Sequence, residues 1–169
     1  LRTARDSIAE LVGVSPSEVY FTSGGTEADN WAVRGIACDG ARGGALLSPV
    51  EHAAVHVPAA RFRSRSVMCS VGEDGVVSPD HVRDLLARDG GMSLVCVMAV
   101  NNETGCVQPV AELAEAAHAC GAYFFSDCVQ AACACDLKEL AGCCDALSLS
   151  AHKLGGPKGV GALIVRKGV

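Results

Sequence analysis

Short apolar runs alternate with longer amphipathic stretches along this chain, and clusters of glycine and proline separate them. Apolar runs bounded by turn residues are typical of buried strands, and they predict strands at 19–22, 45–48, 66–69, 94–100, 122–127, 145–150 and 160–165. Helical spacing with capping residues predicts helices that end near Gly13, that span 26–36, 52–62 and 109–120, and that begin after Ser78. Together these elements indicate an α/β fold of three layers, in which helices cover both faces of a mostly parallel sheet.

The composition is that of one folded domain without an internal linker. The chain has 169 residues, of which 50% are hydrophobic and 20% are charged. The formal net charge of -5 and the lack of a basic stripe argue against a nucleic-acid partner, because binding to phosphates needs clustered Lys and Arg. The longest apolar run, 94–100, is far shorter than the ~20 residues that cross a bilayer, so we expect no membrane span. The first residue is Leu1 and no signal peptide is recognisable, so we expect a fragment.

The chain contains ten cysteines, for which we expect reduced thiols. The length exceeds that of disulfide-rich miniproteins, and no export signal is present. Cys96 lies inside an apolar run, where a thiol packs like a small hydrophobic group. Cys133 with Cys135, and Cys143 with Cys144, lack the CxxC spacing of a metal site. We therefore expect no bound metal.

Polar clusters follow five of the predicted strands directly. They are SGGTEADN, PVEH, NNETG, Asp127 and AHK. Since parallel strands end at one edge of their sheet, residues far apart in sequence are expected to surround one ligand there.

Each cluster also has a structural explanation when it is considered alone. SGGTE is a common glycine turn followed by a helix cap, although Gly24 and Gly25 would also let the backbone approach a phosphate that Thr26 and the helix N-terminus bind. His52 and His56 have the spacing of a metal pair on a helix, but no third ligand has suitable spacing.

Asn101 and Asn102 fit a simple turn after a strand. Two other positions, Asp127 and Lys153, are harder to explain structurally. Asp127, in contrast, follows an apolar strand and is costly to bury unless a cation pairs with it. Lys153 is either a surface lysine or an amine held at the polar edge of the sheet. A lysine, a strand-end aspartate and a phosphate-binding helix start form the set that pyridoxal phosphate requires.

At these residues the chain resembles the cysteine desulfurases of the class V aminotransferase group. The resemblance rests on five ordered motifs that run nearly from end to end: TSGGTEADN, EHAAV, NNETG, Asp127-x-x-Gln130 and SAHKLGGPKGVGAL. It implies the large domain of a pyridoxal-phosphate-dependent transferase of fold type I, which residues 1–169 cover in part.

The resemblance implies a role for each matched residue around the cofactor ring. Lys153 forms the Schiff base with the cofactor, and Asp127 keeps the pyridine nitrogen protonated. Gln130 and Asn102 address the phenolic oxygen, and His52 stacks on the ring and relays protons.

Four more residues match the positions that bind the cofactor phosphate in the family: Gly25, Thr26, Ser150 and His152. The implied reaction removes sulfur from L-cysteine, releases L-alanine and leaves a protein persulfide. The resemblance further implies a sulfur-acceptor or iron–sulfur scaffold protein as partner, a homodimer, and a cytoplasmic location, or an organellar one if a preceding segment carries a transit peptide.

Parts of the family pattern have no counterpart in residues 1–169. None of the ten cysteines matches the family's attacking cysteine, and Cys128 is the one candidate beside the site. The N-terminal segment, the small C-terminal domain and a phosphate contact from the partner subunit are also missing. We therefore expect this chain alone to bind the cofactor weakly and to release no sulfur.

Three alternatives stay open at this point. A selenocysteine lyase shares the chemistry of the lysine and differs in the thiol loop. Other class V aminotransferases share equivalents of Lys153 and Asp127 but fit EHAAV and NNETG poorly. A catalytically silent, truncated scaffold would keep the fold without turnover.

Overall fold

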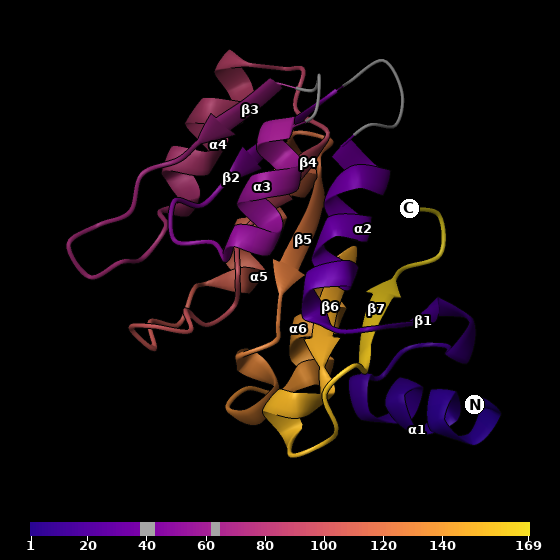
Figure 1. Ribbon diagram of the computed structural model, residues 1–169. Helices are drawn as coiled ribbons and strands as arrows, with labels where there is room; N and C mark the ends of the chain where they lie inside the picture. Colours follow the sequence, from indigo (N-terminus) through magenta and orange to yellow (C-terminus); the bar gives the residue numbers. More distant parts are fainter. Residues whose placement is uncertain (38–42, 62–64) are drawn as a thin grey trace.

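The fold is built on a twisted sheet of seven strands (Figure 1). The computed structural model describes residues 1–37, 43–61 and 65–169. Its strands are β1 (Val19–Thr22), β2 (Gly44–Leu47), β3 (Arg65–Met68), β4 (Leu94–Cys96), β5 (Tyr123–Asp127), β6 (Ala146–Ser150) and β7 (Gly161–Val165). They lie in the order β1-β7-β6-β5-β4-β2-β3, and β7 runs antiparallel to both of its neighbours while the other pairings are parallel. The expectation of a mostly parallel sheet is confirmed.

Helices cover both faces of the sheet, as the sequence pattern predicts. They are α1 (Arg2–Val12), α2 (Gly25–Ala37), α3 (Ala53–Arg61), α4 (Pro79–Arg88), α5 (Val110–Ala119) and α6 (Leu137–Cys143), with short 3-10 turns η1 (Pro16–Glu18), η2 (Ala131–Cys133) and η3 (Ala151–Leu154). The sequence analysis missed α6. Its N-cap is Asp136, whose side chain accepts hydrogen bonds from two backbone N–H groups of the first turn. The last residue of the helix predicted over 52–62 lies outside the described residues.

The two layers of helices enclose two hydrophobic cores, one on each face of the sheet. On one face α2 and α3 bury Val33 and Val55 against Phe125 of β5. On the other face α1, α4, α5 and α6 pack together, and α5 buries Leu113 near Phe124. Because neighbouring residues of a strand point to opposite faces, these adjacent phenylalanines serve different cores. The three-layer prediction is thereby confirmed.

The predicted strand 94–100 is shorter in the structure, where β4 ends at Cys96. Beyond that point Val97 N and Ala99 N still donate to carbonyls of the β5 segment, at 3.2 and 3.0 Å. On the β2 side, however, Met98 N donates to Oε1 of Glu51 at 2.6 Å. A side chain therefore replaces the neighbouring strand, and the regular ladder stops although the sequence stays apolar.

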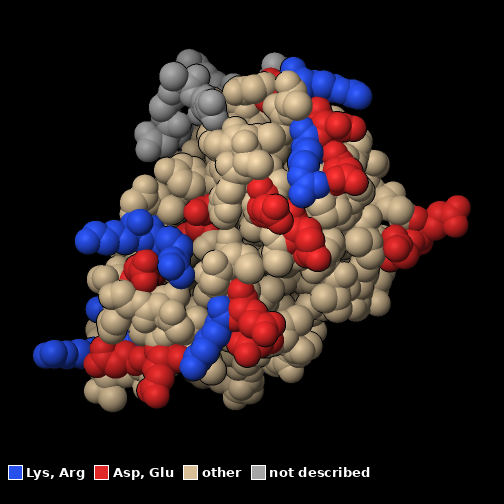
Figure 2. Space-filling view, turned by 180° about the vertical axis from the view of Figure 1, so that it is seen from behind, with Lys and Arg blue, Asp and Glu red and all other residues tan. Residues whose placement is uncertain are grey.

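The surface carries mixed charge. Figure 2 shows acidic and basic side chains interspersed over the face seen from behind, with no continuous basic area on the part of it that is described. None of the helices in the described part of the chain has the length and apolar character that crossing a membrane requires.

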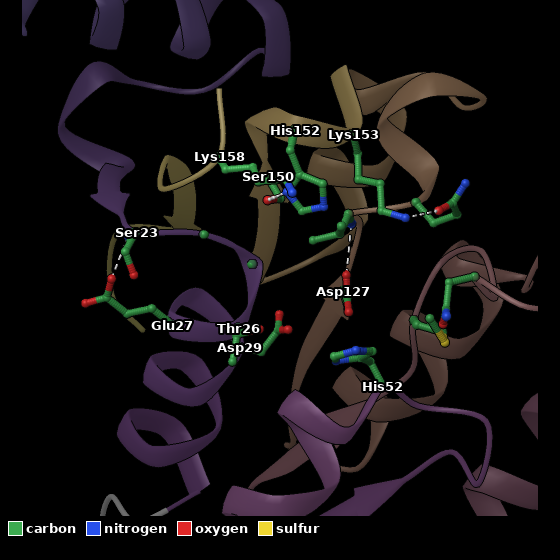
Figure 3. A pocket seen from close by; sticks show the side chains of 16 residues that line it. Ser23, Thr26, Glu27, Asp29, His52, Asp127, Ser150, His152, Lys153 and Lys158 are labelled. Atoms are coloured by element: carbon green, nitrogen blue, oxygen red, sulfur yellow. Dashed lines mark hydrogen bonds between the residues drawn. The ribbon is translucent and has the colours of Figure 1, made fainter. Parts of the chain in front are cut away.

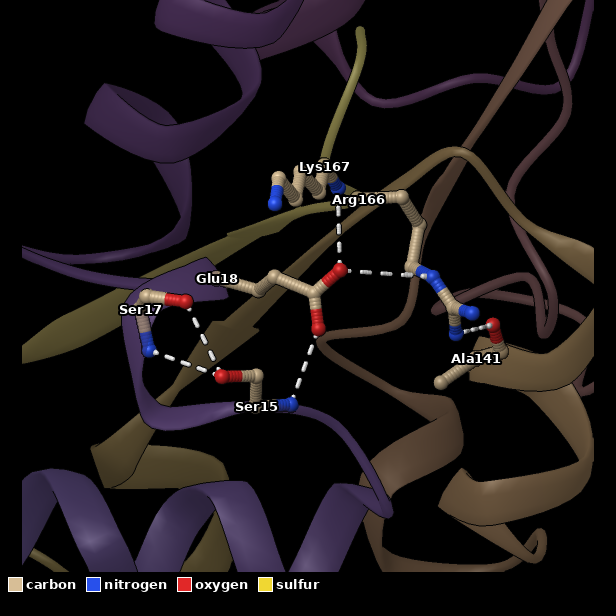
Figure 4. A network of polar contacts seen from close by, with 6 residues as sticks. All are labelled: Ser15, Ser17, Glu18, Ala141, Arg166 and Lys167. Carbon is tan, nitrogen blue, oxygen red and sulfur yellow. Dashed lines mark hydrogen bonds and ion pairs between the residues drawn. The ribbon is translucent and has the colours of Figure 1, made fainter.

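Glu18 ties the N-terminal segment to the end of the chain (Figure 4). Its carboxylate accepts hydrogen bonds from Ser15 N at 2.8 Å and Lys167 N at 2.9 Å. Arg166 Nε lies 3.6 Å from the same carboxylate, and its guanidinium also donates to Ala141 O. The hydrogen bond from Lys167, followed by the one from Ser15, lowers the pKa of Glu18.

We expect Glu18→Gln to lower the free energy of unfolding by about 1 kcal/mol, the usual effect of losing a helix-capping group. Because the pKa of Glu18 is lowered in the folded chain, its contribution is present near neutral pH and is lost as the pH falls through the folded pKa. Thermal unfolding at pH 7 and about pH 3 measures both effects. Glu10→Gln, at an exposed position of α1, is the control. Equal melting temperatures at pH 7 would contradict the prediction.

Candidate active site

A cavity of about 410 Å³ opens where the strands end, and all nine predicted site residues line it (Figure 3). They come from segments far apart in sequence: Gly25, Thr26, His52, Asn102, Asp127, Gln130, Ser150, His152 and Lys153. The parallel strands bring these segments to one edge, because β1, β2, β4, β5 and β6 all point toward it. The expected convergence is confirmed.

A narrow glycine turn connects β1 to α2 at one end of the cavity. Gly24 has a φ of 157°, and Thr22 Oγ1 donates to its carbonyl at 3.0 Å. Gly161 of β7 lies directly against this turn, since a Cβ there would lie 2.6 Å from Gly24 Cα and 2.8 Å from Leu149 O. Two backbones therefore approach as closely as only glycine permits.

Hydrogen-bond donors surround this turn. The first backbone N–H groups of α2 lack helical partners and carry its positive dipole end. Ser150 Oγ and His152 Nδ1 are 2.8 Å apart on the neighbouring η3 side. Together with the hydroxyl of Thr26, these groups form a cradle for an anion such as a phosphate.

Lys153 lies in η3, with its amine directed into the cavity (Figure 3). Its Nζ donates a hydrogen bond of 3.2 Å to Gln130 Oε1. The side chain is exposed, so the amine is accessible to a ligand. Of the two readings that the sequence allows, the structure favours an amine held at the sheet edge.

Asp127, at the end of β5, is buried to 4% exposure and accepts a hydrogen bond from Val129 N at 2.9 Å. Burial raises the pKa of Asp127, and the hydrogen bond from Val129 and the charges of His52 and Lys153 lower it without outweighing burial. The cationic partners that the sequence analysis demanded thus lie in the same cavity, although neither fully compensates the buried carboxylate.

His52 precedes α3 and faces Asp127 in Figure 3. Its Nδ1 accepts a hydrogen bond of 3.1 Å from Ala54 N. In the neutral ring this places the proton on Nε2, which is the nitrogen left to act on a ligand. His56, the other member of the considered metal pair, is not among the residues that line the cavity.

The two asparagines after β4 have different tasks. Asn101 is buried, donates to Val50 O at 2.9 Å, and accepts hydrogen bonds from Glu103 N and Thr104 N. It therefore holds the turn, as the structural explanation expected. Asn102 is exposed and lines the cavity, as the resemblance expected.

Sequence reasoning missed other cavity residues, including Asp29, Met98 and Lys158. Asp29 follows Thr26 by one helical turn, so helical periodicity could have placed it on the cavity side of α2. Lys158 belongs to the GGPKG segment next to Lys153. Met98 lies within an apolar run and gave no signal.

The thiols of the described residues are unsuited to nucleophilic attack where they are buried. Burial raises the pKa of Cys69 to about 11 and raises the pKa of Cys96 and Cys144. Burial also raises the pKa of Cys128, the candidate beside the site. Cys133 is exposed, and its Sγ donates to the backbone carbonyl of Lys153 at 2.7 Å. Among the described residues no group of three or more His, Cys, Asp or Glu could hold a metal ion.

Comparison with known proteins finds relatives over the whole chain. The chain is 41% identical to the cysteine desulfurase IscS of Methanosarcina thermophila over 176 residues, which cover 100% of this chain and 43% of the relative. It is 44% identical to a cysteine desulfurase of Cereibacter sphaeroides over 175 residues, covering 100% of this chain and 45% of the relative. The chain thus spans less than half the length of these relatives.

Solved structures of similar proteins share the fold of this chain. A NifS-like protein superposes with a TM-score of 0.91 at 34% identity, covering 99% of this chain and 47% of that one. SspA in complex with cysteine superposes with a TM-score of 0.90 at 33% identity, covering 98% of this chain and 49% of that one. The sequence model of the class-V aminotransferases matches residues 1–169. The chain therefore belongs to the class V aminotransferase family.

Proposed function

We propose that this chain is the cofactor-binding part of a cysteine desulfurase that depends on pyridoxal phosphate. One observation carries the proposal: an accessible lysine, a buried aspartate and an anion cradle share one cavity at the edge of the sheet. The relatives named cysteine desulfurase support the choice among class V activities.

The residues of the cavity fit this cofactor. The glycine turn that borders the cavity beside the start of α2 keeps its position only because Gly161 has no Cβ, which would lie 2.6 Å from the backbone of Gly24. Ser150 and His152 supply further donors to a phosphate. Asp127 supplies a buried carboxylate, which a cationic ring nitrogen would compensate.

Pyridoxal phosphate supplies an electron sink for the amino acid attached to it. Lys153 would hold the cofactor through its amine, and Gln130 orients that amine through the hydrogen bond of 3.2 Å. Asp127 would hold the proton of the ring nitrogen, because a buried negative charge favours the protonated ring. His52 has its N–H at Nε2, which can donate a hydrogen bond to a ligand in the cavity.

The proposed substrate is L-cysteine. Its sulfur passes to the thiol of a protein cysteine, which becomes a persulfide, while the remainder takes up a proton at the carbon and leaves as L-alanine. The buried thiols of this part of the chain do not suit that role, because burial raises the pKa of each. None of the ten cysteines matches the attacking cysteine of the family motifs, so we place the attacking thiol outside residues 1–169.

We further propose that the persulfide sulfur goes to an acceptor or iron–sulfur scaffold protein, and that the whole protein works as a cytoplasmic homodimer. These points rest on the family resemblance of the motifs.

We expect pyridoxal phosphate to attach to Lys153. Borohydride reduction of the protein with its cofactor, followed by peptide mapping, should place the pyridoxyl group on this residue. Lys158 is a stringent internal control because it lines the same cavity, whereas Lys138 packs against Gly13. A label on Lys158 in place of Lys153 would overturn the assignment.

Asp127→Ala should lower the turnover of the full-length protein by orders of magnitude while the fold survives. The ring nitrogen loses the carboxylate that keeps it protonated. The measurement is sulfide release from L-cysteine under reducing conditions. Turnover above roughly a tenth of the wild-type value would contradict the role, since that loss is under about 1.4 kcal/mol of transition-state stabilisation.

Gly161→Ala should weaken cofactor binding and lower stability by about 1–3 kcal/mol, because the new Cβ would lie 2.6 Å from the backbone of Gly24. Gly35→Ala in α2 is the matched control, since nothing lies within 4 Å of its added Cβ. We expect the control to gain about 0.5–1 kcal/mol and to bind normally. Fluorescence titration with pyridoxal phosphate and thermal melts test both; equal binding by the two variants would refute the cradle.

A further inference from the structure

Two buried carboxyl groups, Asp29 and Asp127, line the cavity, and a third, Glu51, is buried close enough to feel the charge of both. Asp29 of α2 is 1% exposed, Glu51 before α3 is 7% exposed, and Asp127 of β5 is 4% exposed. Their negative charges repel one another. The charge of Asp127 raises the pKa of Asp29, and the charges of Asp127 and Asp29 raise the pKa of Glu51. Three buried negative charges at such close quarters would be very costly, so protons must neutralise part of the cluster.

Ser148 of β6 contacts one of these carboxyl groups and is the register neighbour of another. Its Oγ donates to Asp29 Oδ1 at 2.5 Å. Across the sheet it pairs with Asp127, whose pKa its hydroxyl lowers. Figure 3 shows the carboxyl group of Asp29 directed toward Asp127.

A hydroxyl group has one proton and can donate it to only one of two carboxylates. If both were ionised, one of them would face the oxygen lone pairs of Ser148. A proton on Asp29 would remove this conflict, because Asp29 would then donate to Ser148 Oγ and the hydroxyl proton of Ser148 would be free to turn toward Asp127, its neighbour in the register. Such a chain of hydrogen bonds would be complete with one negative charge.

The surroundings decide which of the two keeps the charge. Burial, followed by the charge of Asp127, raises the pKa of Asp29 to about 8, and Ser148 lowers it only in part. Asp127 has additional support for its charge, namely Val129 N, His52 and Lys153.

Glu51 is the remaining titratable group of the cluster. Burial raises its pKa to about 8, and in neither protonation state does it carry a positive charge that would favour an ionised Asp29. Its Oε1 accepts from Met98 N, and its Oε2 has no hydrogen-bond partner among the described residues.

We propose that Asp29 is a neutral positioning residue for the cofactor ring: its proton lets Ser148 donate to Asp127, which leaves Asp127 as the single negative charge that faces the ring nitrogen. The inference rests on the proposed function. It assigns to α2 a second task beside the anion cradle, since one helix then positions both ends of the cofactor.

The first test uses the full-length protein without cofactor. Because the folded pKa of Asp29 lies above its ordinary value, the folded wild type binds a proton that the unfolded chain releases, and its stability falls as the pH rises toward 8. Asp29→Asn removes this titration, so the melting temperature of the variant relative to the wild type should increase from about pH 5 to about pH 8. Asp6→Asn, at an exposed position of α1, should show no such trend. Parallel curves for Asp29→Asn and the wild type would overturn the proposal.

The second test adds pyridoxal phosphate labelled with ¹⁵N and measures the chemical shift of its ring nitrogen. Asp29→Asn should keep the shift of the protonated ring, because the amide N–H donates to Ser148 as the acid does. Ser148→Ala should move the shift toward that of an unprotonated ring. Ser126→Ala removes another buried hydroxyl, which donates to Val97 O, and should leave the shift unchanged.

The outcomes separate the two proposals. If Asp29→Asn shifts the nitrogen as far as Ser148→Ala does, Asp29 acts as a charge and the inference fails while the proposed function stands. If the wild type binds no cofactor, the proposed function fails and the role toward the ring fails with it, even where the melts show a neutral Asp29.

Discussion

The direction of the strands decides where this protein can hold a ligand. A parallel strand needs a crossover to reach its neighbour, so each chain segment leaves the sheet at the same edge and returns at the other. Five segments leave at the edge where the cavity lies. The antiparallel β7 starts at that edge, and its first residue, Gly161, lies against the glycine turn. Lysine, aspartate, histidine and the phosphate cradle meet there because of topology, although Thr26 and Lys153 lie 127 positions apart in the sequence.

The same edge concentrates unfavourable electrostatics. A globular core excludes unpaired charge, yet Asp29, Glu51 and Asp127 are nearly inaccessible to water. The fold tolerates them through hydrogen bonds from Ser148, Met98 N and Val129 N, together with protonation. Such a cluster does not help the domain to fold, because buried carboxyl groups lower its stability. It suits the binding of a cationic ring, so the requirements of stability and of ligand binding conflict here.

The sequence was sufficient for the architecture and for part of the cavity. Apolar runs and caps located the strands and most helices, the strand-end rule predicted that the polar clusters meet, and the family resemblance named the nine residues that line the cavity. The strand prediction failed where a side chain takes the hydrogen-bonding place of a neighbouring strand. Nothing in LVCVMAV reveals that Met98 N donates to the carboxylate of Glu51 and not to a strand carbonyl. The sequence analysis also missed Asp29, an acid near the start of α2 that is buried and hydrogen-bonded to Ser148 of β6. Periodicity reports which face of a helix is covered, not what covers it.

The contact between Cys133 and Lys153 affects how chemical-modification experiments should be interpreted. The thiol of Cys133 is exposed in η2, and it donates to the backbone carbonyl of the lysine in η3. An alkylating reagent or an oxidant that modifies this sulfur removes the donor and adds bulk beside the turn that carries the amine. Inactivation by thiol reagents, and protection by cofactor, can therefore arise without any reaction at a sulfur-transferring cysteine. Only a Cys133→Ser background separates the two causes.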